Sequence, residues 1–200
     1  MARLTREQSQ ALTREKLLRS AGDVVARYSY DGASVERIAE DAGFSKGAFY
    51  SNFSSKEDIL QQLLEGNAGN DVKDLTRLLK TVQDPHEVIE AVAQWSDSRA
   101  AEQKWGIIAI EMLRRAQLDG TLTDRQRQLF ASQWEEVGRL LRSKLFPDCD
   151  VEISAVGLGG IVLELTYGGI AVFLKVNTAG QIVREVLTAL RRSVRVTHGQ

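Results

Sequence analysis

Hydrophobic residues recur about every 3.6 positions along nearly the whole chain, and no run alternates between polar and apolar residues as a strand would. This period is typical of helices that bury one face. The first apolar stripe ends at the Asp31-Gly32 pair. Its members are Leu17, Leu18, Ala21, Val24, Val25 and Tyr28. The pattern predicts an all-α protein of nine or ten helices.

Two short helices are predicted in quick succession after the first stripe. Ser34 is a suitable N-cap for a helix that Gly43 ends, and Ser45 is a suitable N-cap for a helix that ends near Tyr50. The spacing around residues 42–44, Ala-Gly-Phe, is that of a helix-turn-helix. The alternative is a tight helical hairpin within a bundle, because serine, glycine and aromatic residues also form ordinary turns.

The second short helix has residues suited to a DNA surface. Ser45 and the free amides at the helix start are able to hold a phosphate, and Lys46 supplies positive charge. Gly47 lacks the side chain that would keep the backbone away from DNA, and Tyr50 presents a hydroxyl to a phosphate. In a helix-turn-helix this second helix enters the major groove.

The later helices carry similar start signals. Ser54 and Glu57 have the spacing of a capping box, which opens a helix that either continues to about Thr81 or breaks at Gly66 and Gly69. Further helices are predicted from Asp84-Pro85, over residues 105–118 as a central helix, from Thr123-Asp124 to Pro147, over residues 153–174, and from Thr178 to about Arg195.

Composition indicates a globular chain and leaves the partner open. The 200 residues are 43% hydrophobic and 26% charged, and the net charge of -1 favours neither nucleic acid nor a membrane. A local excess of positive charge lies in residues 1–19, either as a basic arm or as a solvated helix start. It comprises Arg3, Arg6, Arg14, Lys16 and Arg19 against Glu7 and Glu15.

Several features indicate a cytoplasmic protein. Cys149 is the single cysteine, which excludes an intramolecular disulfide, and the N-terminus lacks the apolar core of a secretory signal. Residues 153–174 are long enough to cross a membrane, but Glu164 and five glycines interrupt them. A helix buried on most sides, which another helix approaches closely, explains this segment better.

Residues 10–65 resemble the N-terminal DNA-binding domain of the TetR family of bacterial transcriptional regulators. The similarity lies in Ile38-Ala39, Ala42-Gly43, Ser45-Lys46-Gly47, Tyr50, Phe53 and Lys56-Glu57, after the Leu17-Leu18 helix. It implies a DNA-binding domain over residues 1–56 and a helical domain over 57–200 that dimerises and binds a small inducer. The protein would then be a homodimeric repressor that an inducer releases from a palindromic operator.

The resemblance also assigns residues to the DNA interface. Lys56 would hold a phosphate, and Arg3 and Arg6 would reach a minor groove. The sequence departs from the family pattern at Phe44 and Asn52, which puts in doubt which bases are read. The full predicted set is Arg3, Arg6, Ser34, Ser45, Lys46, Gly47, Tyr50, Asn52 and Lys56.

Dimerisation follows from the size of one short recognition helix, which covers too few base pairs for useful affinity. Helices over residues 123–146 and 153–174 would form a four-helix bundle across the two-fold axis, as is usual in the family. The alternative is an ordinary core within one chain. The predicted interface residues are Leu129, Val137, Leu141, Ile161, Leu165 and Val172.

Large apolar side chains of the C-terminal part either pack in its core or line a ligand cavity. They are Trp95, Trp105, Met112, Phe130, Trp134 and Tyr167. We expect no metal or cofactor, and an inducer whose identity the sequence leaves open. An enzyme is the rival class, but His86 and His198 are far apart and only Glu111 and Glu164 remain as candidates. A helical interaction module without DNA is a third class.

Overall fold

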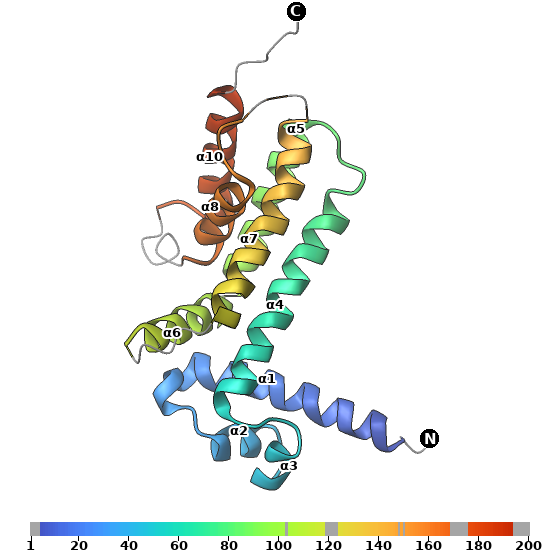
Figure 1. Ribbon diagram of the computed structural model, residues 1–200, viewed down its shortest axis with the longest axis vertical. Helices are drawn as coiled ribbons and strands as arrows, with labels where there is room; N and C mark the ends of the chain where they lie inside the picture. The colour runs from blue at the N-terminus through green and yellow to red at the C-terminus, as the bar shows by residue number, and fades with distance from the viewer. Residues whose placement is uncertain are drawn as a thin grey trace, which may run out of the picture. The chain divides into compact units, whose positions relative to one another are not determined.

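The computed structural model describes residues 5–102, 104–118, 124–147, 149, 151–168 and 176–193. These residues form helices and no strand, which confirms the all-α prediction (Figure 1). The helices are α1 (Arg6–Gly32), α2 (Val35–Asp41), α3 (Lys46–Tyr50), α4 (Lys56–Leu78), α5 (Pro85–Ala101), α6 (Lys104–Leu118), α7 (Asp124–Leu145), α8 (Ala155–Tyr167) and α10 (Ala179–Ser193).

The chain divides into two compact units. The first takes in Met1–Asn67 and Ile107–Leu122, and the second takes in Ala68–Gly106 and Thr123–Gln200. The division falls inside α4, which is continuous through Gly66 and Gly69. The domain boundary predicted at residues 56/57 coincides instead with the start of that helix.

Local signals at the helix starts are confirmed where one residue dominates. Ser34 and Ser45 cap α2 and α3 by accepting hydrogen bonds from the amides of Arg37 and Ala48, each at 3.2 Å. Asp84 caps α5 in the same way, with proline in its first turn. Thr178 and Gln181 form the predicted capping box of α10.

The start of α4 differs from the prediction by one residue. Ser55, rather than Ser54, accepts a hydrogen bond from the amide of Asp58, and the Asp58 carboxylate accepts one from the amide of Ser54. Glu57 instead accepts a hydrogen bond from the Tyr30 hydroxyl. Two adjacent serines and two adjacent acids allow either box, and the contact with Tyr30 occupies Glu57.

Two further predictions are wrong. Tyr28 was assigned to the buried stripe of the first helix, but 45% of its surface is exposed. Ser29 has a φ of +61°, so the helix kinks there and the buried aromatic residue is Tyr30. The helix over residues 105–118 is not central, since α6 exposes 53% of Ile110.

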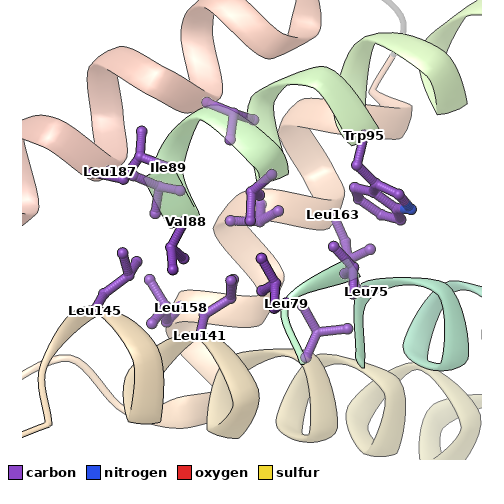
Figure 2. Close-up of a cluster of buried hydrophobic side chains, with 14 of the residues drawn as sticks. Leu75, Leu79, Val88, Ile89, Trp95, Leu141, Leu145, Leu158, Leu163 and Leu187 are labelled. Atoms are coloured by element: carbon purple, nitrogen blue, oxygen red, sulfur yellow. The ribbon is translucent and has the colours of Figure 1, made fainter. Parts of the chain in front are cut away.

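The second unit has a core built from five helices. Figure 2 shows leucines and other apolar side chains from α4, α5, α7, α8 and α10 pointing toward one another. Burying each such leucine contributes roughly 1.5–3 kcal/mol. The labelled members are Leu75, Leu79, Val88, Ile89, Trp95, Leu141, Leu145, Leu158, Leu163 and Leu187.

The backbones of α7 and α8 touch at two glycines. A Cβ at Gly138 would lie 1.7 Å from the carbonyl oxygen of Ala155, and one at Gly159 would lie 1.9 Å from that of Trp134. The small residues therefore allow a close helix crossing, as the glycine-rich segment predicted.

No helix in the described ranges combines the length and apolarity needed to span a membrane.

Candidate nucleic-acid interface

A tight turn joins α2 to α3. Gly43 adopts a φ of +78°, a conformation that L side chains rarely take. The amide of Phe44 donates to the carbonyl of Ala39 at 2.8 Å, and the amide of Gly43 donates to that of Glu40 at 3.0 Å. These two bonds form a Schellman motif, which ends α2 and directs the chain into α3.

The position of α2 is fixed by a buried serine of α1. The Ser20 hydroxyl lies 2.8 Å from the carbonyl oxygen of Ile38 and 2.8 Å from the Asp41 carboxylate. Ile38 and Ala39 are both buried, and so is Phe49 of α3. The helix-turn-helix is therefore anchored on its inner side by apolar packing and by Ser20.

The outer side of α3 presents the predicted DNA residues. Ser45, Lys46, Gly47 and Tyr50 are all exposed, Tyr50 by 51%. A Cβ on Gly47 would make only an ordinary contact, 3.7 Å from the Ser45 hydroxyl. The fold therefore does not require glycine at this position, whereas a close approach of DNA to the backbone would.

Lys46 forms an exposed ion pair with Glu36 of α2. The hydrogen bond from Lys46 lowers the pKa of the Glu36 carboxyl, and the same bond raises the pKa of Lys46. Because both side chains are about half exposed, the pair contributes little to stability. It places the Lys46 ammonium beside Glu36 at the surface of the helix-turn-helix.

Lys56 contacts main-chain groups at the end of α1. Its ammonium donates to the carbonyls of Tyr30 and Ala33, both at 2.9 Å, and lies 4.0 Å from the Tyr30 ring centroid. These contacts tie the start of α4 to the end of α1. The periodicity of the sequence contains no sign of them, because they depend on the kink at Ser29.

The remaining predicted DNA residues lie outside the exposed face of α3. Asn52 is half-buried and donates from its side-chain amide to the carbonyl of Ala48 at 2.8 Å, so it closes the end of α3. Ser34 caps α2 and Arg6 is exposed in the first turn of α1. Arg3 lies outside the described residues.

Known proteins resemble this chain both in the helix-turn-helix and in the overall fold. The family model for bacterial regulatory proteins of the tetR family matches residues 17–63, which contain α2, α3 and the turn between them. Residues 17–63 therefore match the N-terminal domain of the TetR family. The match adds no support to the enzyme alternative.

Two curated relatives of this chain are regulators by name. The chain is 45% identical over 53 residues to the HTH-type transcriptional regulator YwcC of Bacillus subtilis, which is 26% of this chain and 24% of the relative. It is 26% identical over 120 residues to the HTH-type transcriptional repressor AcnR of Corynebacterium jeikeium, which is 60% of this chain and 54% of the relative. Each alignment spans less than two thirds of the relative's length.

A solved structure shows the same fold over nearly the full length. The fatty acid degradation regulator FadR from Bacillus halodurans superposes with a TM-score of 0.72 at 20% identity, covering 92% of this chain and 97% of that one. At this identity the likeness extends to the fold alone.

The predicted ligand residues are distributed over both compact units. Met112 belongs to the first compact unit and the other five belong to the second. The Trp105 indole donates to Glu102 at 3.3 Å on the surface, and Phe130 is half-buried. Trp134 lines an outer groove. Tyr167 donates to Asp71, and the Trp95 ring centroid lies 6.0 Å from the guanidinium carbon of Arg99.

A polar cluster centres on Asp71 of α4, whose side chain has no exposed surface. Asp71 accepts hydrogen bonds from the Tyr167 hydroxyl at 2.8 Å and the Gln133 amide at 3.0 Å, and lies 3.2 Å from Nε of Arg99. Burial raises the pKa of Asp71 to about 6. The buried Nε1 of Trp95 has no hydrogen-bond partner among the described residues. Sequence analysis missed this cluster, because its members come from four helices.

The predicted dimer residues lie in different environments. Val137 and Leu141 have no exposed surface within one chain, so they belong to its core, in contrast to the prediction. Ile161 and Leu165 line an apolar groove of about 600 Å³, together with Trp134, Val156 and other residues of the second unit. Leu129 is half-buried, and Val172 lies outside the described residues.

Proposed function

We propose that this TetR-family protein is a homodimeric transcriptional repressor that binds a palindromic DNA operator and leaves it when a small molecule binds. The observation that carries the proposal is the exposed face of α3, where Lys46, Gly47 and Tyr50 are supported from behind by buried Phe49. A relative named as a repressor supports the direction of regulation. Such a protein works on chromosomal DNA, so the proposal implies a cytoplasmic location.

The apolar groove of the second unit supports the homodimer. Val156 exposes 38% of its surface there, beside half-buried Ile161 and Leu165. An exposed apolar surface of this kind is typical of a protein interface. In a two-fold dimer the same groove would meet its own copy, and two heads would contact half-sites about one helical turn apart.

The contacts of α4 support control by a small molecule. This helix contributes residues to both compact units, and its Asp71 contacts Arg99, Gln133 and Tyr167 of other helices. An inducer that favours a conformation with incorrectly spaced heads must weaken DNA binding, and DNA must weaken inducer binding by the same factor. The inducer itself is unidentified.

Selection of duplexes from a random pool tests DNA binding. The wild-type chain should enrich a near-palindrome whose affinity falls steeply with salt concentration. The double variant Lys46→Ala and Tyr50→Ala should lose this affinity while remaining folded and dimeric. The control is Arg77→Ala, since Arg77 is 80% exposed in the second unit. Enrichment of no sequence by a folded, dimeric wild-type chain would refute the proposal.

A further inference from the structure

The helix proposed to enter DNA is too short to hold its own orientation. α3 has five residues, far fewer than an isolated helix needs in water. Ser45 caps its first turn and Phe49 anchors its inner side. The residues that follow α3 need a further support, because they connect its last turn to α4.

Arg14 of α1 provides this support. Its guanidinium donates through Nη1 to the carbonyl oxygen of Asn52 at 2.7 Å, two residues beyond the end of α3. The carbon atom of the guanidinium lies 4.3 Å from the ring centroid of Phe53, which is 2% exposed. A planar group held by a hydrogen bond and a ring has a defined position.

The other side of the guanidinium reaches α4. Arg14 donates through Nη2 to the side-chain oxygen of Gln62, and Gln62 donates in turn to Asp58 at 2.6 Å. Asp58 also accepts a hydrogen bond from the amide of Ser54. Arg14 therefore connects α1 and α4 to the segment that ends α3.

Asn52 transmits this connection into α3 itself. Its main-chain carbonyl receives the Arg14 bond, and its side-chain amide donates to the carbonyl of Ala48 at 2.8 Å. A shift of Arg14 would therefore move the last turn of α3, which carries Tyr50. The neighbouring Phe49 and Phe53 rings, 5.7 Å apart, would shift with it.

The geometry points to Arg14 as a positioning residue that sets the orientation of α3 and thereby the specificity of DNA recognition. This inference rests on the proposed function, since it concerns how the same helix binds DNA. Because Arg14 acts through Asn52, its loss should weaken binding to the preferred sequence more than binding to DNA in general. The rival role is a phosphate contact by Arg14 itself, which would weaken both equally and reduce the salt dependence.

The test compares Arg14→Met with Arg19→Met. Arg19 lies on the same helix with its side chain 67% exposed, so its variant removes the same charge without the bridge. The probes are the duplex selected by the wild-type chain and a scrambled duplex of equal length. Urea unfolding of each variant establishes that it is folded at the assay temperature, so that stability does not enter the affinities.

Arg14→Met should bind the selected duplex at least about tenfold more weakly than Arg19→Met, as expected for the loss of charge-assisted hydrogen bonds. The two variants should bind the scrambled duplex equally, with equal dependence of log K on log salt. Binding of the selected duplex within about twofold of the control would overturn the inference. A salt slope smaller by about 0.9 would overturn it in favour of a phosphate contact.

Gln62→Met tests the same bridge from α4 and retains the Arg14 charge. It should lose specificity in the same direction, and the double variant should bind no more weakly than Arg14→Met, because both changes break one connection. Additive losses would overturn the bridge. If Arg14→Met does not fold, Gln62→Met carries the test alone. If the wild-type chain selects no duplex, the proposed function fails and this inference fails with it.

Discussion

Asp71 is a buried carboxylate whose protonation should control the stability of the second compact unit. Burial raises its pKa from 3.8 to about 6, although the Tyr167 hydroxyl and the Arg99 charge act in the opposite direction. Between these two pH values, the folded chain holds a proton that the unfolded chain has released. The free energy of unfolding therefore falls as pH rises through this window.

The difference in pKa sets the size of the effect. Ionisation of Asp71 above pH 6 should cost the folded state about 3 kcal/mol relative to a carboxyl that stays neutral. Asp71→Asn keeps the shape of the side chain and does not ionise. Relative to wild type, the variant should therefore gain about 3 kcal/mol of stability between about pH 4 and about pH 7.

Urea unfolding of both proteins at a series of pH values measures this difference directly. Titration of other groups cancels between the two proteins, since they differ at one position. Asp124→Asn is the matched control, because it makes the same chemical change at a side chain that is 98% exposed. A constant difference between Asp71→Asn and wild type across the window would refute the assigned role of burial.

Three other substitutions test the head and the helix crossing. Gly47→Ala should retain thermal stability or raise it by about 0.5–1 kcal/mol, because alanine has the higher helix propensity. It should weaken binding of the selected duplex about tenfold, as measured by fluorescence anisotropy. Unchanged affinity would show that DNA does not approach the backbone there. Glu36→Gln should tighten DNA binding about threefold at low salt, because it releases Lys46 and removes a negative charge, and weaker binding would contradict this. Gly159→Ala should lower the melting temperature, with a cost of about 3 kcal/mol, because its Cβ would overlap the Trp134 carbonyl; an unchanged melting temperature would contradict the crossing.

Sequence patterns predicted where the helices begin and end better than they predicted which surfaces cover them. Caps such as Ser34, Ser45 and Asp84 depend on residues within one turn, so the sequence contains the whole signal. Apolar periodicity indicates which face of a helix is buried, but not whether the covering surface belongs to the same chain. Val137 and Leu141 were assigned to a dimer for this reason, although both lie in the core.

The DNA-binding head shows the same limit for polar residues. The exposed positions of Lys46 and Gly47 followed from the helix-turn-helix spacing. Lys56 and Arg14 carry the same positive charge as Lys46, but their hydrogen-bond partners lie 23 to 48 residues away along the chain. Only the folded arrangement of α1, α3 and α4 shows that these two side chains bind protein groups.

The glycine crossing of α7 and α8 has a consequence for how self-recognition could change during evolution. Gly138 and Gly159 join the two helices through backbone atoms, while the outward groove is formed by side chains such as Val156, Ile161 and Leu165. Substitutions in the groove can therefore alter the surface that we propose to meet a second subunit, without repacking the helices beneath it. A lineage carrying several such regulators could diversify its pairing preferences at these positions and keep one common scaffold.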